Sequence, residues 1–289
     1  MRELTLHNLI HRVDALPEVP QVAFRVIQLL NIPDTAVSQL AELIGADQAL
    51  TAKLLRLCNS AYYGLSRKVT TVSEAIMIVG FSAVKSMVLM ITTQSTMNKG
   101  LLGYRIKPGE FWLHSLGAAE SARFIARQCK DPREEECFTA GLIHDIGKMV
   151  LNQCALPEIY RATNLMQKEN ISIYAAEARI LGFNHAEAGA TLADRWKFPP
   201  LLVDAIRYHH DFENAPGDNL PFIITLANAM SKLLYDPAPE LSTAIWSHLT
   251  PHEALIQKRL GLSLSEIEAL LPSIQNQIDK TSELVTTRS

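Results

Sequence analysis

Apolar residues recur at helical spacing from one end of this chain to the other, and this periodicity limits the folds that the chain can adopt. Leu50, Leu54, Leu57 and Cys58 stand at positions i, i+4, i+7 and i+8, so they share one face of a helix over residues 48–59. Alternating β-branched runs are few, and neither Asn-Gly hairpin dipeptides nor a glycine-rich phosphate loop is present. The sequence therefore predicts an all-α fold.

Capping signals mark where individual helices begin. Thr71 is followed three residues later by Glu74, which is the spacing of a capping box, and Gly80 interrupts the apolar pattern that follows. Asn184 stands three residues before Glu187 and gives the same signal. A helix that starts there has His185 in its first turn.

Two breaks in the periodicity predict the organisation of the chain. Lys, Gly and Pro interrupt the pattern over residues 98–109, and residues 237–240 form a second break before a capping box at Ser263 and Glu266. These breaks predict an N-terminal helical subdomain over residues 1–98, a helical core over residues 110–235 and a C-terminal helical extension over residues 236–289.

Composition narrows the class of protein. An apolar content of 48% suits a packed core, and a formal charge of -3 offers no basic excess for nucleic-acid polymers or anionic membranes. The four cysteines lack CxxC spacing, so buried reduced thiols are expected. The N-terminus has no apolar signal segment, and the longest charge-free stretch is too short and polar to span a bilayer. We expect a cytoplasmic protein.

Five of the nine histidines fall within the central segment: His114, His144, His185, His209 and His210. Asp145 directly follows the second of them. Imidazole and carboxylate groups bind divalent first-row metals, so the set suggests a metal site. A single histidine on an apolar face is usually a hydrogen-bonded core residue, and this interpretation is preferred for His7, His11, His248 and His252.

Small residues beside two of these histidines predict a close helix contact. Gly117, Ala118, Ser121 and Ala122 follow His114 at i+3, i+4, i+7 and i+8. Ala140 and Gly141 precede His144. Two helices that approach along these faces can direct both imidazoles toward one point.

The octapeptide Gly141-Leu142-Ile143-His144-Asp145-Ile146-Gly147-Lys148 resembles the signature of the HD superfamily of metal-dependent phosphohydrolases. The chain as a whole resembles the HDOD family over about Leu16 to Leu234. The matching motifs, in order, are Leu16–Pro20, Leu54–Ala61, Ala75–Gly80, His185–Ala190, Trp196–Pro199 and His209-His210. The resemblance implies two packed helical subdomains, of which the C-terminal one is an HD-type helical core.

The resemblance also implies roles for single residues. His114 is the first metal ligand, His144 and Asp145 are the central pair, and Asn228 stands where a closing Asp is expected. His185, His209 and His210 match the additional ligands of the HD-GYP phosphodiesterases, relatives that cleave cyclic dinucleotides. In a catalytic member, Asp145 would bridge the metal that activates water, and Lys148 would face a substrate phosphate. Iron, manganese and zinc are the candidate metals.

Two departures from the catalytic pattern separate the functional hypotheses. Asn228 supplies a neutral oxygen in place of a carboxylate, and the Gly-Tyr-Pro segment expected after the His-His pair is absent. The first hypothesis is a bacterial signal-transduction module that binds a signalling protein through its N-terminal subdomain, or binds a ligand. The second is a metal-dependent phosphohydrolase or phosphodiesterase acting on a nucleotide or cyclic dinucleotide. The sequence leaves catalysis open.

Overall fold

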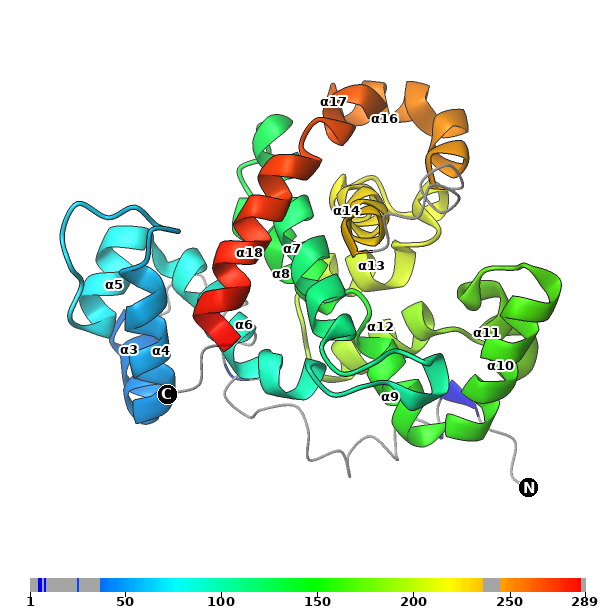
Figure 1. The fold of residues 1–289 in the computed structure, drawn as a ribbon, viewed down its shortest axis with the longest axis horizontal. Helices are drawn as coiled ribbons and strands as arrows, with labels where there is room; N and C mark the ends of the chain where they lie inside the picture. The colour runs from blue at the N-terminus through cyan, green and yellow to red at the C-terminus, as the bar shows by residue number, and fades with distance from the viewer. Residues whose placement is uncertain (1–4, 7, 9–24, 26–36, 236–244, 287–289) are drawn as a thin grey trace.

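The computed structural model describes residues 5, 6, 8, 25, 37–235 and 245–286 (Figure 1). The described residues form helices and no strand, and one isolated bridge pairs Leu101 with Ile106. The all-α prediction is therefore confirmed. The motif at Leu16–Pro20 and the predicted break at Pro237–Glu240 lie outside the described residues.

Four helices of the N-terminal region gather on one side of the molecule (Figure 1). They are α3 (Val37–Gly45), α4 (Gln48–Cys58), α5 (Val72–Val79) and α6 (Phe81–Met97). The predicted stripe of α4 is buried, and Asp47 caps this helix by accepting a hydrogen bond from the Leu50 amide. Thr71 caps α5 in the same way. Gly80 separates α5 from α6. Its φ is 93°, a conformation that few residues other than glycine adopt.

The central region carries most of the helices. They are η2 (Leu102–Tyr104), α7 (Glu110–Gln128), α8 (Glu134–Ile143), α9 (Ile146–Cys154), α10 (Leu156–Glu169), α11 (Ile173–Leu181), α12 (His185–Arg195), α13 (Pro200–Tyr208), η3 (Phe212–Asn214) and α14 (Leu220–Tyr235). The capping box predicted at Asn184 is present, and it starts α12 at His185.

The C-terminal helices fold back over this central region (Figure 1). They are η4 (Thr250–His252), α16 (Glu253–Leu260), α17 (Leu264–Glu268) and α18 (Leu271–Thr286). Ser263 and Glu266 form the predicted capping box at the start of α17. Helix α18 packs against α7 and also contacts α4, so the C-terminal extension contacts both the N-terminal helices and the core.

Helix α7 lies between α8, α14 and α18, and glycines set its closest contacts. A Cβ placed on Gly141 of α8 would lie 2.7 Å from the carbonyl oxygen of Ala118. A Cβ on Gly117 would lie 2.7 Å from the hydroxyl of Ser231 on α14. The close helix contact predicted from the small residues is confirmed, and it brings His114 beside His144.

The cysteines follow the expectation in part. All four are free, and Cys58 and Cys137 are buried, but Cys129 and Cys154 are only partly buried. Burial raises the pKa of the Cys58 thiol to about 11. Among the described residues, no helix is long and apolar enough to cross a membrane.

Candidate metal centre

Asp145 lies at the junction of two helices. Helix α8 ends at Ile143, α9 begins at Ile146, and the side chain of Asp145 is 1% exposed. Oδ2 of Asp145 lies 3.4 Å from Nε2 of His114 and 3.4 Å from Nε2 of His144. Oδ1 lies 3.3 Å from Nε2 of His185 and 3.4 Å from Nε2 of His209. One carboxylate is thus surrounded by imidazoles from four separate segments.

The opposite ring nitrogen of each of these histidines has its own partner. Nδ1 lies 2.8 Å from the carbonyl oxygen of Gly141 for His144, and 2.6 Å from that of Ile206 for His209. Nδ1 of His114 lies 3.1 Å from the hydroxyl of Ser231. Carbonyl acceptors require the N–H tautomer at Nδ1, which leaves Nε2 with a free lone pair. This is the arrangement that orients metal-binding imidazoles in known metalloproteins.

Glu177 orients His185. Its Oε2 lies 2.6 Å from Nδ1 of His185 and accepts the His185 backbone N–H at 2.7 Å. Its Oε1 accepts a hydrogen bond from the hydroxyl of Tyr104 at 2.7 Å, and the carboxylate is fully buried. The fifth imidazole, His210, lies with its Nε2 3.1 Å from Nε2 of His185. Neither Glu177 nor Tyr104 was identified from the sequence.

The charges of the centre follow from burial. Burial lowers the pKa of His114 to about 4 and that of His209 to about 3, because a charged imidazole loses its hydration there. The pKa of His185 is raised instead, since the attraction of Glu177 outweighs burial. Burial opposes ionisation of Asp145, but Lys148 and the imidazoles outweigh it and hold its pKa well below the ordinary value. The lowered pKa values favour neutral imidazoles at His114 and His209 beside the carboxylate anion of Asp145, and metal ligation requires these protonation states.

Buried polar atoms without a partner test whether a metal would fit. Among the described residues these atoms include Nε2 of His114, His144 and His209, Oδ1 of Asp145 and Oδ1 of Asn228. Such atoms are costly to bury unless something binds them. Two ligands of one ion, each about 2.0–2.2 Å from it, lie about 3.0–3.4 Å apart. The observed separations match this spacing, so the residues fit a divalent transition metal.

The ligand atoms form two groups that share Asp145. One group holds His114, His144 and Asp145, and the other holds Asp145, His185, His209 and His210. Within each group, the ligand atoms lie within 4.8 Å of one another. Each group has enough donor atoms to hold one ion, and both groups would use Asp145.

Asn228 lies on the face of α14 that contacts this centre. Thr225, one turn before it, donates a hydrogen bond to the backbone carbonyl of His209, and Ser231, one turn after it, donates one to that of His114. Residues three apart share a helix face. The side chain of Asn228 is 4% exposed, which agrees with the position predicted for it beside the centre.

Two of the histidines that were expected to be unrelated to a metal site, His248 and His252, belong to neither ligand group. His252 contacts Glu213 and meets Phe212 edge to face, and His248 packs against His252. His7 and His11 lie outside the described residues.

Lys148 and Lys232 stand beside the centre on the wall of a cavity of about 500 Å³. Nζ of Lys148 lies 2.5 Å from Oδ2 of Asp145. Lys148 was among the site residues implied by the resemblance, but Lys232 was not. The sequence did contain a signal for Lys232, which is the only charged residue in the apolar stretch Leu220–Tyr235. Glu177 gave a similar signal as the only acidic residue in Ile173–Leu181. A charge isolated on an apolar helix is expensive to bury and usually has a partner.

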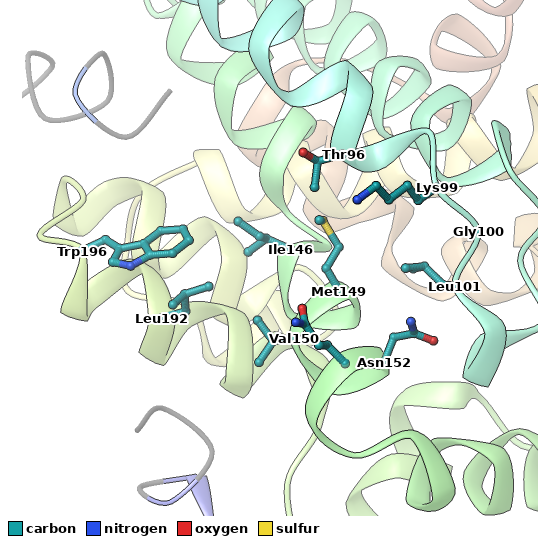
Figure 2. Close-up of a pocket in the computed structure, with 11 residues that line it drawn as sticks. Thr96, Lys99, Gly100, Leu101, Ile146, Met149, Val150, Asn152, Leu192 and Trp196 are labelled. Carbon is teal, nitrogen blue, oxygen red and sulfur yellow. The ribbon is translucent and has the colours of Figure 1, made fainter. Parts of the chain in front are cut away.

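A second cavity, of about 310 Å³, lies on another face of α9 (Figure 2). Ile146, Met149 and Val150 of α9 line it together with Leu192 and Trp196. None of the described metal-ligand candidates lines this cavity. The chemistry of the site is therefore confined to the side of α9 that carries Asp145 and Lys148.

Replacing Glu177 with Gln should weaken metal binding in the group that contains His185. The variant keeps the shape of the side chain but removes the charge that makes His185 more basic, so we expect an affinity about tenfold lower for one of two ions. Competition with a chelator measures this change. Glu169→Gln is the matched control, because Glu169 only pairs with Arg179 at the surface. Equal affinities in the two variants would contradict the assigned role of Glu177.

Known proteins resemble this chain in sequence and in fold. The model of the HDOD domain matches residues 16–212. An uncharacterised protein of Treponema pallidum is 29% identical over 224 residues, which cover 75% of this chain and 42% of that protein. The chain spans less than half the length of the curated relatives it matches.

Solved structures agree over nearly the whole length. An HDOD domain protein of unknown function from Geobacter sulfurreducens superposes with a TM-score of 0.75 at 26% identity, over 98% of both chains. A protein from Shewanella amazonensis, described as a proposed metal-dependent phosphohydrolase, superposes with a TM-score of 0.61 at 18% identity, over 97% of both chains. At this identity, the second likeness shows the fold alone. Because the HDOD model covers more than half of the sequence, this chain belongs to the HDOD family.

Proposed function

We propose that this chain is an HDOD signal-transduction module whose HD core holds divalent transition metal and binds a ligand beside it. One observation carries the proposal: four imidazole Nε2 atoms converge on Asp145 at 3.3–3.4 Å, each on a ring whose other nitrogen contacts a hydrogen-bond partner. Packing alone does not explain this convergence. A buried ring nitrogen that binds nothing costs free energy, so the arrangement is favourable only if the nitrogens bind a ligand such as a metal ion.

The donor set defines which residues would hold which ion. His114, His144 and Asp145 would hold one ion, with Asn228 as a further oxygen ligand. Asp145, His185, His209 and His210 would hold the other. Nitrogen and carboxylate donors suit iron, manganese and zinc, and thiolates, which would favour zinc or copper, are absent from both groups.

A signalling partner is proposed to dock on the N-terminal helices. Met77 and Ile78 of α5 are 73% and 37% exposed, and large apolar side chains at such exposure often mark contact surfaces. The motif Ala75–Gly80, which distinguishes HDOD proteins from other HD relatives, contains both residues. The partner would therefore bind away from the metal centre.

A second candidate function is hydrolysis of a phosphate ester. The observation that favours it is a cavity lined by His114, Asp145 and Lys148. A ligand in this cavity has access to the metal centre. Bound metal would supply Lewis-acid activation of water and of the phosphate. Lys148 would stabilise charge that develops on the phosphate oxygens. Asn228 argues for slow turnover, because a neutral amide orients water less well than a carboxylate.

Metal analysis and hydrolysis assays test both functions. Protein purified without chelator should contain iron, manganese or zinc, and it should cleave bis(4-nitrophenyl) phosphate slowly or not at all when these metals are added. Asn228→Asp, which adds a charged ligand at nearly unchanged volume, should tighten metal binding about tenfold or more. A metal-free protein that takes up no added metal would refute the metal centre. Rapid turnover by the wild type, lost in His144→Ala, would make hydrolysis, and not signal transduction, the better supported function.

A further inference from the structure

The cavity beside the metal centre is built from three parts of the chain. The start of α7 and the segment before it contribute Ile106, Glu110, Phe111 and His114. The start of α9 contributes Asp145 and Lys148, and the end of α14 contributes Ser231, Lys232 and Tyr235. Its volume of about 500 Å³ falls within the range of about 300–1,000 Å³ typical of small-molecule sites. The cavity is therefore large enough for an organic ligand.

Lys232 is a half-buried cation on the cavity wall, without a partner among the described residues. Its ammonium group has no hydrogen bond or ion pair among the described residues, whereas Lys148 is paired with Asp145. Burial lowers the pKa of Lys232 to about 8, with a smaller contribution from the repulsion of Lys148, and the attraction of Asp145 only partly offsets these effects. A charged ammonium group in this position costs free energy unless an anion binds to it.

Access to the metal centre is unequal. His144, His185 and His209 are fully buried and do not line the cavity. His114 keeps 17% of its side chain exposed and lies on the cavity wall with Asp145. A ligand in the cavity therefore reaches the group formed by His114, His144 and Asp145 through His114 and Asp145, on a wall that also carries both lysines.

The walls also restrict what kind of anion fits. Lys148, Lys232 and a metal ion would present positive charge to the cavity, which suits a dianion better than a monoanion. Apolar surface on the same wall comes from Ile106, Phe111 and Tyr235. Glu110 is the one carboxylate besides Asp145 on the wall, and it accepts a hydrogen bond from the Lys107 amide.

We propose that Lys232 and Lys148 together bind the phosphate group of a small organic phosphomonoester in this cavity, at the group that contains His114. The proposal rests on the proposed function in one respect, namely that the HD core binds a ligand beside its metal. It adds the chemical class of that ligand and assigns its recognition to Lys232, a residue outside both metal-binding groups.

Calorimetric titration of the full chain with phenylphosphonate tests the proposal. Phenylphosphonate imitates a phosphomonoester and has no ester bond to hydrolyse, and its monomethyl ester imitates a diester. Lys232→Met keeps most of the apolar stem and removes the charge. Charge-assisted hydrogen bonds of this kind correspond to about 10–100-fold in affinity. We expect Lys232→Met to bind phenylphosphonate at least tenfold more weakly than the wild type, and the wild type to prefer phenylphosphonate over its monomethyl ester.

Lys168→Met is the matched control, because Lys168 is an exposed residue of α10 in the same core. It should bind phenylphosphonate as the wild type does. The content of iron, manganese and zinc, measured on every sample, should be the same in all three proteins. Equal phenylphosphonate affinity of the wild type and Lys232→Met, no binding by the wild type, or equal binding of the monomethyl ester would overturn the proposal.

Metal content separates this proposal from the proposed function. Iron, manganese or zinc retained with equal phenylphosphonate affinities refutes the role of Lys232 and leaves the metal centre intact. If the wild type holds none of these metals and takes up none when they are added, the metal centre fails, and the metal-free proteins still decide the role of Lys232. A tenfold loss in metal-free Lys232→Met supports the lysine site, and equal affinities refute it.

Discussion

The Asp145→Asn variant should lose metal from both ligand groups at once, with affinity reduced by at least about 100-fold. Changes to residues that only orient a ligand already alter metal affinity by about 10–100-fold. Asp145 contributes more, because each of its oxygens faces a different pair of imidazoles at 3.3–3.4 Å. Competition with a chelator, followed by metal analysis, measures the loss.

Fold stability separates this loss from unfolding. The Asp145→Asn substitution leaves Lys148 without its anion, and breaking a buried pair costs about 3–5 kcal/mol. We expect a smaller cost here, because the cavity lets the Lys148 ammonium reach water. Asp194→Asn, at an exposed position of α12, is the matched control and should retain wild-type metal content. If Asp145→Asn kept both ions, the carboxylate would not bridge the two groups.

The Gly147→Ala variant should be strongly destabilised. A Cβ on Gly147 would lie 1.9 Å from the carbonyl oxygen of His185 and 2.7 Å from the backbone nitrogen of Gly189. Backbone atoms cannot rotate away as a side chain can, so α9 and α12 must separate. Overpacking of this kind typically costs about 1–3 kcal/mol, and a contact with backbone lies at the upper end. Denaturant unfolding of the metal-free protein measures the change in free energy.

Metal content gives this variant a second readout. Separating α9 from α12 moves His185 away from Asp145, so Gly147→Ala should lose metal from the group that contains His185 even under conditions where it remains folded. Gly45→Ala is the control, since a Cβ at Gly45 meets no atom within 4 Å and its φ is not positive. Equal stability of Gly147→Ala and Gly45→Ala would show that the α9–α12 contact relaxes easily.

Local signals predicted the helices because the interactions that start and stop a helix are local. The caps at Thr71, Asn184 and Ser263 join residues three positions apart, and the glycine break at Gly80 depends on one backbone torsion. The stripe of α4 needed only helical periodicity. The domain limits predicted from breaks in the apolar periodicity stay predictions, and the second break lies outside the described residues.

Motif resemblance predicted the ligand candidates. The structure brings the five histidines and Asp145 together, and Asn228 lies on the helix face that contacts them. Without the resemblance, the residue types suggested a metal site and the small residues suggested that His114 and His144 converge, but spacing could not show that all the ligand segments meet, because they form no local chelate. Glu177 and Lys232 were missed for the same reason. Glu177 acts through His185, eight residues away, and Lys232 matters only through a cavity shared with residues more than eighty positions earlier.

By itself, the sequence determined the helical class, the main helix starts, the family and the set of candidate ligands, since each depends on short-range pattern or on matching motifs. Only the tertiary structure decided that one carboxylate faces four imidazoles, that Glu177 holds His185 and that the cavity opens toward His114 and not toward His209. The physical reason is that these features depend on how closely helices pack. Gly117, Gly141 and Gly147 set those distances through contacts with residues far away in the chain.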